Sequence, residues 1–198
     1  MGIDLRQAIR PAIVVLLLMT VLLGLLYPLA ILGLGQAIMP HQANGSLVRD
    51  GDRVVGSALI GQSFATPGYF NGRPSAAGEG YDASASSGSN LGPTSRALID
   101  RVKEAAPATG LSNNIPADLV TASASGLDPH LSPAAALAQA GRVAAARGLS
   151  VATVRNLVTS NTEAPLASVL GEPRVNVLAL NRQLDRLAPN RAGAAATP

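Results

Sequence analysis

The sequence of 198 residues contains no cysteine, and this absence excludes several classes of protein at once. Disulfide frameworks, thiolate zinc sites, iron–sulfur clusters and cysteine nucleophiles all need a thiol. Charge is scarce as well, since charged residues make up 14% of the chain and Lys103 is the only lysine. The net charge is +3, and the basic residues form no cluster that would follow a nucleic-acid backbone. Nucleic acid is therefore not an expected partner.

Residue patterns for catalysis are almost missing too. The chain has two histidines, His41 and His130, and it has no H-E-x-x-H motif, no acidic cluster and no P-loop signature. We therefore expect no metal site, no catalytic residue and no ATP hydrolysis by this chain alone. One enzyme alternative stays open, a serine hydrolase in which Ser123 or Ser125 works with His130. No G-x-S-x-G elbow accompanies these residues.

Apolar residues are abundant, and they are concentrated near the beginning of the chain. Mean hydropathy is +0.28, and residues 12–39 contain no charged side chain. A helix of that length reaches about 42 Å, more than the ~30 Å hydrocarbon core of a bilayer. The run predicts a transmembrane helix over residues 12–32, continuing as apolar chain to Met39. Pro28 is expected either to kink this helix or to mark where it leaves the deepest lipid. A cleaved signal peptide is the alternative, but its apolar region is normally shorter.

The residues that flank the apolar run predict its orientation. Arg6 and Arg10 precede the run, whereas only His41 lies between its end and Arg49. Lysine and arginine collect on the cytoplasmic side of membrane helices. We therefore expect residues 1–11 to form a short cytoplasmic N-terminus in the inner or plasma membrane, with the main domain outside.

The remaining sequence predicts one α+β domain over residues 41–187 and a flexible tail over residues 188–198. Apolar pairs around Asp50-Gly51 predict a hairpin, and residues 58–60 are expected to extend its strand or begin another. Residues 61–93 lack periodicity, which is typical of a functional or partner-bound loop. The fold class is thus a single N-terminal transmembrane helix followed by one α+β extracytoplasmic domain.

Periodicity and capping residues place the helices of that domain. Helices are expected over residues 95–105, 133–147, 151–158 and 178–187, with a strand over residues 174–177. Ser132 and Ser150 are the expected N-caps, and Gly148 is the expected C-cap. The apolar residues that share one face of the first helix are Leu98, Ile99, Val102 and Ala106. The buried stripe of the second helix is expected at Leu137, Ala140 and Val143 or Ala144, and the third helix carries Val154, Leu157 and Val158. The inward residues of the last helix are expected to be Leu180, Leu184 and Leu187.

Three stretches look more specific than ordinary loops. Residues 68–76 combine aromatic side chains with an arginine, which fits either a hydrophobic plug or a docking surface. Residues 87–93 fit a tight turn or an anion-binding loop, and residues 118–130 fit a turn assembly that leads to the Ser132 cap. The candidates for a partner interface are Phe64, Tyr69, Phe70, Arg73, Ser89, Asn90, Leu91, Asp128 and His130.

Several short strings follow the apolar run in a fixed order. They are residues 42–47, 56–62, 68–70, 73–76, 89–91, 119–123, 125–128, 139 with 142–144, and 175–178 with 180–181. Together they closely resemble the C subunits of the Kdp potassium-transporting P-type ATPases of bacteria and archaea, over about residues 12–187. One departure is Ser87, where the family form Ser-Gly-Gly-Ser-Asn has a glycine. A position with positive φ would strain a serine.

The resemblance implies a non-catalytic accessory subunit of a high-affinity, ATP-driven potassium uptake complex. The implied partners are a potassium-selective channel-like subunit, a P-type subunit that hydrolyses ATP, a small single-span subunit and membrane lipid. One role associated with the family is assembly and stability of the complex. The other is that of a catalytic chaperone that raises the ATP affinity of the hydrolysing subunit, with Gln139 as the candidate nucleotide contact. No cofactor is expected to bind tightly, and ATP would bind through a ternary complex.

The two roles depend differently on topology. If the domain lies outside, Gln139 is a membrane thickness away from cytoplasmic ATP, so the coupling would have to be allosteric. We therefore favour assembly and capping of the outer potassium entrance. Without the resemblance, the sequence predicts a single-span anchored extracytoplasmic binding domain of unknown ligand. On the residues alone, Gln139 is expected to be a solvated helical side chain.

Overall fold

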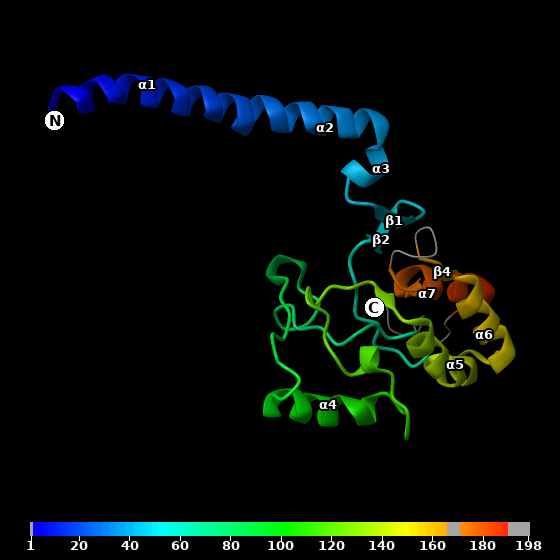
Figure 1. Cartoon of the computed structure of the whole chain (residues 1–198). Coiled ribbons are helices and arrows are strands. Elements are labelled where there is room, and N and C mark those ends of the chain that lie inside the picture. Colours follow the sequence, from blue (N-terminus) through cyan, green and yellow to red (C-terminus); the bar gives the residue numbers. More distant parts are fainter. Residues whose placement is uncertain (1, 166–170, 190–198) are drawn as a thin grey trace, which may run out of the picture. The chain divides into compact units, whose positions relative to one another are not determined.

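The computed structural model describes residues 2–165 and 171–189, with side chains from Gln7 onward. The chain divides into two compact units, Met1–Leu47 and Val48–Pro198 (Figure 1). Of the tail expected over residues 188–198, residues 190–198 lie outside the described residues.

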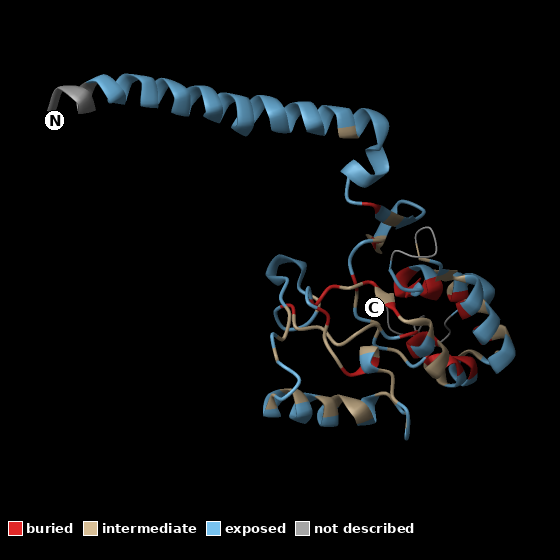
Figure 2. Ribbon diagram, viewed as in Figure 1, coloured by how far each residue is buried: buried red, intermediate tan, exposed pale blue. Residues whose placement is uncertain are grey.

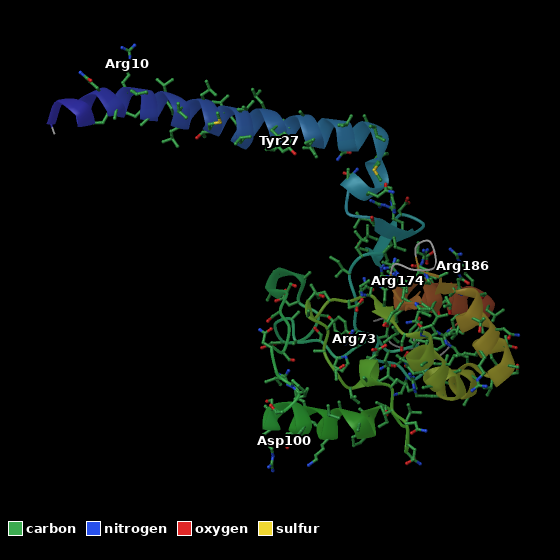
Figure 3. All side chains as sticks on the ribbon, in the orientation of Figure 1. Arg10, Tyr27, Arg73, Asp100, Arg174 and Arg186 are labelled. Atoms are coloured by element: carbon green, nitrogen blue, oxygen red, sulfur yellow. The ribbon has the colours of Figure 1, made fainter. Side chains whose placement is uncertain are left out.

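The first unit is a long apolar helix. α1 (Gly2–Val21) passes through a π-helical turn (Leu22–Leu26) into α2 (Tyr27–Ile38), and the short α3 (Pro40–Ala43) follows. Proline has no N–H to bond a carbonyl four residues back, and the wider π-turn lies just before Pro28. The helix over Gln7–Ile38 contains an 18-residue window with a mean hydropathy of 2.6, which makes it a candidate membrane span. The apolar side chains are exposed along the helix (Figure 2), and Arg10 and Tyr27 project from it (Figure 3).

The second unit begins with the predicted hairpin. β1 (Leu47–Asp50) and β2 (Arg53–Ser57) form a two-stranded sheet, and Gly51 has a φ of +57° in the turn between them. The expectation that residues 58–60 continue or begin a strand is wrong. Ser57 ends β2 because its hydroxyl accepts the N–H of Leu59 at 3.2 Å and closes a turn.

A small antiparallel sheet and three helices form the centre of this unit. The sheet has the order β3 (His130–Leu131), β5 (Arg174–Asn176), β4 (Thr162–Glu163), with Leu131 and Thr162 both opposite Val175. α5 (Pro133–Arg147) packs against α6 (Val151–Ser160), and α6 packs against α7 (Val177–Leu187). The core contains Phe70, Leu119, Leu131, Ala135, Ala136, Ala140, Val143, Ala144, Val154, Val158, Val175, Val177, Leu180 and Leu184.

The predicted caps are confirmed. The hydroxyls of Ser132 and Ser150 accept the backbone N–H groups of Ala135 and Thr153, at 3.2 and 3.0 Å. Gly148 ends α5 in the left-handed conformation, with a φ of +66°. The strand expected over residues 174–177 ends one residue earlier, because the Asn176 side chain accepts the N–H of Ala179 at 3.0 Å and caps α7.

The predicted apolar faces of α5, α6 and α7 are buried or half-buried except at Leu187, whereas the face expected over residues 98–106 is not buried. Leu187 is 51% exposed at the end of α7, and Ile99 is 44% exposed on α4 (Arg96–Ala108). No side chain of α4 is buried, and α4 lies apart from α5, α6 and α7 in Figure 1. The expectation of an irregular stretch over residues 61–93 is confirmed, since it holds only the 3-10 turn Ala83–Ala85, and a second such turn, Ala117–Leu119, follows α4.

Candidate functional site

Five consecutive backbone carbonyls, from Pro67 to Asn71, accept hydrogen bonds from side chains of α5 and α7. We call residues 67–71 the clamped segment. Their donors are Arg142 Nη1 to the oxygens of Pro67 (2.6 Å) and Tyr69 (3.1 Å), Arg147 Nε to Gly68 (2.7 Å), Asn181 Nδ2 to Phe70 (3.0 Å) and Gln139 Nε2 to Asn71 (3.0 Å). These bonds fix a stretch of loop that belongs to no helix or strand.

Two side-chain amides bind both backbone groups of the residues that they hold. Asn181 accepts the N–H of Phe70 at 2.8 Å besides donating to its carbonyl, and Gln139 accepts the N–H of Asn71 at 2.9 Å in the same way. Each amide thereby replaces the neighbouring strand that would satisfy these groups in a sheet. Asn181 is 1% exposed and its bonds to Phe70 are buried, whereas Gln139 is 4% exposed and its bonds to the exposed Asn71 are partly buried.

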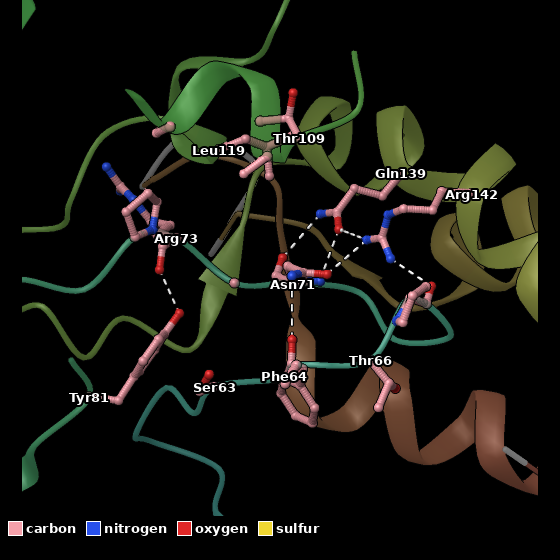
Figure 4. A pocket seen from close by; sticks show the side chains of 16 residues that line it. Ser63, Phe64, Thr66, Asn71, Arg73, Tyr81, Thr109, Leu119, Gln139 and Arg142 are labelled. Carbon is pink, nitrogen blue, oxygen red and sulfur yellow. Dashed lines mark hydrogen bonds between the residues drawn. The ribbon is translucent and has the colours of Figure 1, made fainter. Parts of the chain in front are cut away.

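Gln139 is buried, so the expectation of a solvated helical side chain is wrong. Its Oε1 also accepts Arg142 Nη2 at 2.6 Å (Figure 4). Its Nε2 also lies 3.4 Å from the carbonyl oxygen of Ala135. The two donors and two lone pairs of the amide are thus all used within the chain. Its role as a nucleotide contact stays a prediction. The sequence held a signal of burial, because Gln139 lies four residues before Val143 on the apolar face of α5.

Arg147, which no motif in the sequence singles out, anchors the clamped segment from the C-terminal end of α5. Its side chain is 1% exposed, its guanidinium lies 4.6 Å from the Tyr69 ring centre, and Nη1 lies 2.8 Å from Asp185 Oδ1. The Tyr69 hydroxyl donates to the other Asp185 oxygen at 3.0 Å. Burial, and then this bond to Asp185, raise the pKa of Tyr69. Nothing local in the sequence connects residues this far apart.

The predicted interface residues separate into core and surface positions. Phe70 is completely buried, which favours the hydrophobic-plug interpretation for this side chain. Phe64 and Tyr69 are half-buried, with ring centres 5.5 Å apart. Asn90 is exposed, and its neighbours Ser89 and Leu91 are half-buried. Their role in an interface stays a prediction.

The loop around Ser87 is fixed by backbone contacts. Ser87 donates its N–H to the carbonyl of Ser125 at 3.0 Å. Its φ is not positive, so the departure from the family form brings no strain. Opposite it, Gly126 has a φ of +67°, and a Cβ there would lie 2.6 Å from the Ser87 oxygen.

Arg73 lies beside Asp128 and His130, from which it is distant in sequence. Asp128 lies 3.6 Å from Arg73 Nη1 and 3.4 Å from His130 Nδ1, and it accepts the backbone N–H of His130 at 3.0 Å. The hydrogen bond from the His130 side chain is the main cause that lowers the pKa of Asp128. Ser123 and Ser125 have hydroxyls 3.4 Å apart, and no hydrogen bond in the described part of the chain joins either one to His130. The hydrolase alternative therefore gains no support.

A cleft of about 400 Å³ lies beside the clamped segment (Figure 4). Gln139 and Arg142 line it from α5, and α4 lines it with its C-terminal turns. The remaining lining comes from Ser63, Phe64, Ala65, Thr66, Pro67, Asn71, Gly72, Arg73, Pro74, Tyr81 and Leu119. Burial raises the pKa of Tyr81 and lowers the pKa of Arg142. Among the described residues, no group of three or more His, Asp or Glu side chains is placed to hold a metal ion.

The sequence model of KdpC, the c chain of K+-transporting ATPases, matches residues 9–186. The chain belongs to the KdpC family. It is 60% identical over 185 residues to the potassium-transporting ATPase KdpC subunit of Caulobacter vibrioides strain NA1000, covering 91% of this chain and 94% of that one. The KdpC subunits of Beijerinckia indica and Acidobacterium capsulatum are each 54% identical, covering 92% and 90% of this chain and 95% and 98% of theirs.

Membership in the KdpC family confirms the resemblance found in the sequence. As a KdpC chain, the protein is a non-catalytic subunit of a K+-transporting ATPase. The clamped segment contains the Gly68-Tyr69-Phe70 string that carries part of this resemblance, and the two amide clamps come from Gln139 and Asn181, which belong to two further strings. Strings that are separate in the KdpC sequence therefore meet at one place in the fold.

Proposed function

We propose that this KdpC chain stabilises the assembled potassium-transporting ATPase, with its second unit outside the membrane and above the potassium entrance. Its partners in this proposal are a potassium-selective channel-like subunit, a P-type subunit that hydrolyses ATP and a small single-span subunit. Membrane lipid surrounds the helix Gln7–Ile38. The proposal assigns no chemical step to the chain itself.

The observation that carries the proposal is the use of the Gln139 amide inside the chain. Its four hydrogen-bonding positions are taken by Asn71, Ala135 and Arg142. A nucleotide that bound this amide would first have to break one of these bonds, leaving a partly buried polar group without its partner. This favours a stabilising role for Gln139 over direct contact with ATP.

A second candidate function is that of a catalytic chaperone, in which ATP binds between this chain and the hydrolysing subunit. The size of the cleft favours it, because about 400 Å³ lies within the range of small-ligand sites. Arg142 and Arg73 line the cleft and carry the charge that phosphates prefer. This function needs the second unit in the cytoplasm, whereas the first proposal needs it outside.

Topology decides between the two candidates, and the absence of cysteine makes the measurement clean. Ser112 is exposed in the loop after α4, so Ser112→Cys offers a thiol to reagents without disturbing the core. In intact cells with the complex assembled, a membrane-impermeant maleimide is expected to label this variant. Gln7→Cys, at the opposite end of the span, is the matched control and is expected to react only after permeabilisation. The reverse pattern would overturn the proposal and favour the nucleotide role.

A further inference from the structure

We propose that the cleft between α4 and the clamped segment is a docking surface for an acidic segment of another subunit of the complex. The proposal rests on the proposed function, because it takes its partner from the assembled ATPase. It adds the place of contact and the chemistry of the segment that binds there, an apolar stretch that carries Asp or Glu.

The charge of the cleft argues for an acidic partner. Arg73 and Arg142 are the charged residues among those that line it, and no lining residue is acidic. Arg73 has Asp128 as its counter-ion, at 3.6 Å. Arg142 bonds the neutral oxygens of the clamped segment and of Gln139, and none of the ion pairs in the described part of the chain includes it. A half-buried positive charge without a counter-ion attracts a carboxylate from outside.

The walls of the cleft argue for an apolar partner segment around that carboxylate. α4 contributes Ala105 and Ala108 to the lining, and none of its side chains is buried. Phe64, Pro74 and Leu119 continue the apolar lining. Covering such a surface is favourable in proportion to the apolar area removed from water.

The floor of the cleft argues for a peptide over a nucleotide. Gln139 uses its whole amide within the chain, and Arg142 places four bonds from its two terminal nitrogens on oxygens of the same chain. Phosphate groups are held by several free donors, whereas one carboxylate needs mainly a complementary field and a dry surface. In this arrangement Gln139 is a positioning residue, because it holds the floor against which the partner segment packs.

Charge variants at Ala108 test the proposal in the assembled complex. Ala108 is exposed and lines the cleft, so a longer polar side chain there changes the field without replacing a core residue. Ala108→Glu and Ala108→Gln have the same size and differ in charge. Ala145→Glu and Ala145→Gln are the matched control pair, on an exposed part of α5 that does not line the cleft.

The readout is the amount of this chain that co-purifies with a tagged ATP-hydrolysing subunit in detergent. We expect Ala108→Glu to reduce retention about tenfold relative to Ala108→Gln, because like charges repel across a desolvated contact. The Ala145 pair is expected to be retained equally. Equal retention of the two Ala108 variants would overturn the docking proposal. Failure of the wild-type chain to co-purify would instead overturn the proposed function in assembly.

A second measurement remains decisive even if the charge variants fold poorly. A photo-crosslinking benzoylphenylalanine at position 108, compared with the same group at position 145, is expected to link specifically to an acidic segment of another subunit. No cross-link from position 108 in the intact complex would overturn the proposal. Loss of 8-azido-ATP labelling in Ala108→Glu with unchanged retention would overturn it too, because the cleft would then hold a nucleotide.

Discussion

Gln139 and Asn71 form a reciprocal pair of hydrogen bonds, in which the side-chain amide of one binds both backbone groups of the other. The Asn71 N–H donates to Gln139 Oε1 at 2.9 Å, and Gln139 Nε2 donates to the Asn71 carbonyl at 3.0 Å. Asn181 and the adjacent Phe70 repeat the arrangement from α7. Irregular backbone in a compact unit needs such partners, because unpaired buried N–H and C=O groups are costly.

Removing the first amide should destabilise the second unit. Gln139→Ala leaves both backbone groups of Asn71 without their partner, and we expect a loss of about 2–4 kcal/mol in the free energy of unfolding. Urea unfolding of the full-length chain in detergent, followed by circular dichroism, measures this change. Gln183→Ala, at an exposed position of α7, is the control and should stay within about 0.5 kcal/mol of wild type. A similar loss of unfolding free energy in Gln139→Ala and Gln183→Ala would show that the bonds between Gln139 and Asn71 do not stabilise the unit.

The second amide allows a test with a pH signature. Asn181→Asp keeps an acceptor for the Phe70 N–H but removes the amide N–H that donates to the Phe70 carbonyl. The carboxyl that replaces the amide lies at a position that is 1% exposed. Burial raises the pKa of an introduced carboxyl above its unfolded value of about 3.9. The folded state then holds the carboxyl proton more tightly than the unfolded state does. The free energy of unfolding of Asn181→Asp should therefore be greatest at low pH and should fall as the pH rises through the pKa of this carboxyl in the folded state.

The measurement for Asn181→Asp is urea unfolding between pH 4 and 8, with Asn181→Ala beside it. The alanine variant should lose stability at every pH without that slope. If the two profiles were parallel, the residue would not be held in a shielded position.

Two glycines, one in a crowded loop and one at an open position of a helix, test the local packing of the second unit. At Gly126 a Cβ would lie 2.6 Å from the Ser87 oxygen and 2.7 Å from the Ala77 nitrogen, at a φ of +67°. Gly126→Ala should therefore cost several kcal/mol, on the order of 3, through strain and displaced backbone. Gly141 lies inside α5, and beyond its chain neighbours and the backbone of its own helix no described heavy atom lies within 4 Å of a Cβ there, so Gly141→Ala should stabilise the chain by about 0.5–1 kcal/mol. Thermal unfolding of both variants would show shifts of opposite sign.

Asp128 should make stability depend on pH in the acid range. The His130 side chain, followed by the other hydrogen bonds and charges around it, lowers the pKa of Asp128. As the pH falls, the Asp128 carboxylate is therefore protonated in the unfolded chain before it is protonated in the folded chain. The stability that this carboxylate contributes is fully present above a pH of about 3.9, its pKa in the unfolded chain. This contribution is lost as the pH falls from there through the lower pKa that Asp128 has in the folded state.

We expect Asp128→Asn to be less stable than wild type at pH 6 and to approach it below a pH of about 4. Asp100→Asn, in the exposed pair with Arg96, serves as the control and should change little at any pH. A constant gap between wild type and Asp128→Asn down to pH 3 would mean that the carboxylate charge is not what stabilises this cluster.

Local features of the sequence predicted the local features of the fold. The length and apolarity of residues 12–39 predicted the long helix, and Ser132 with Pro133 and Gly148 predicted both ends of α5. The Asp-Gly turn predicted the hairpin of β1 and β2. These signals work because helix length, capping and turn conformation depend on residues only a few positions apart. Leu187 and Ile99 fit the helical period but lie at surfaces that the rest of the unit leaves uncovered.

The sequence by itself determined the family, the candidate span and the capped helices of this protein, because each is written in neighbouring residues or in the order of short strings. The tertiary structure alone decided what those strings do together. It showed that Gln139, Arg142, Arg147 and Asn181 hold the backbone of residues 67–71, contacts that span 68 to 111 residues of sequence. From the sequence, a polar side chain is expected to be solvated, because its hydrogen-bond partners are not visible there. Only folding brings the distant backbone groups that bind it into contact.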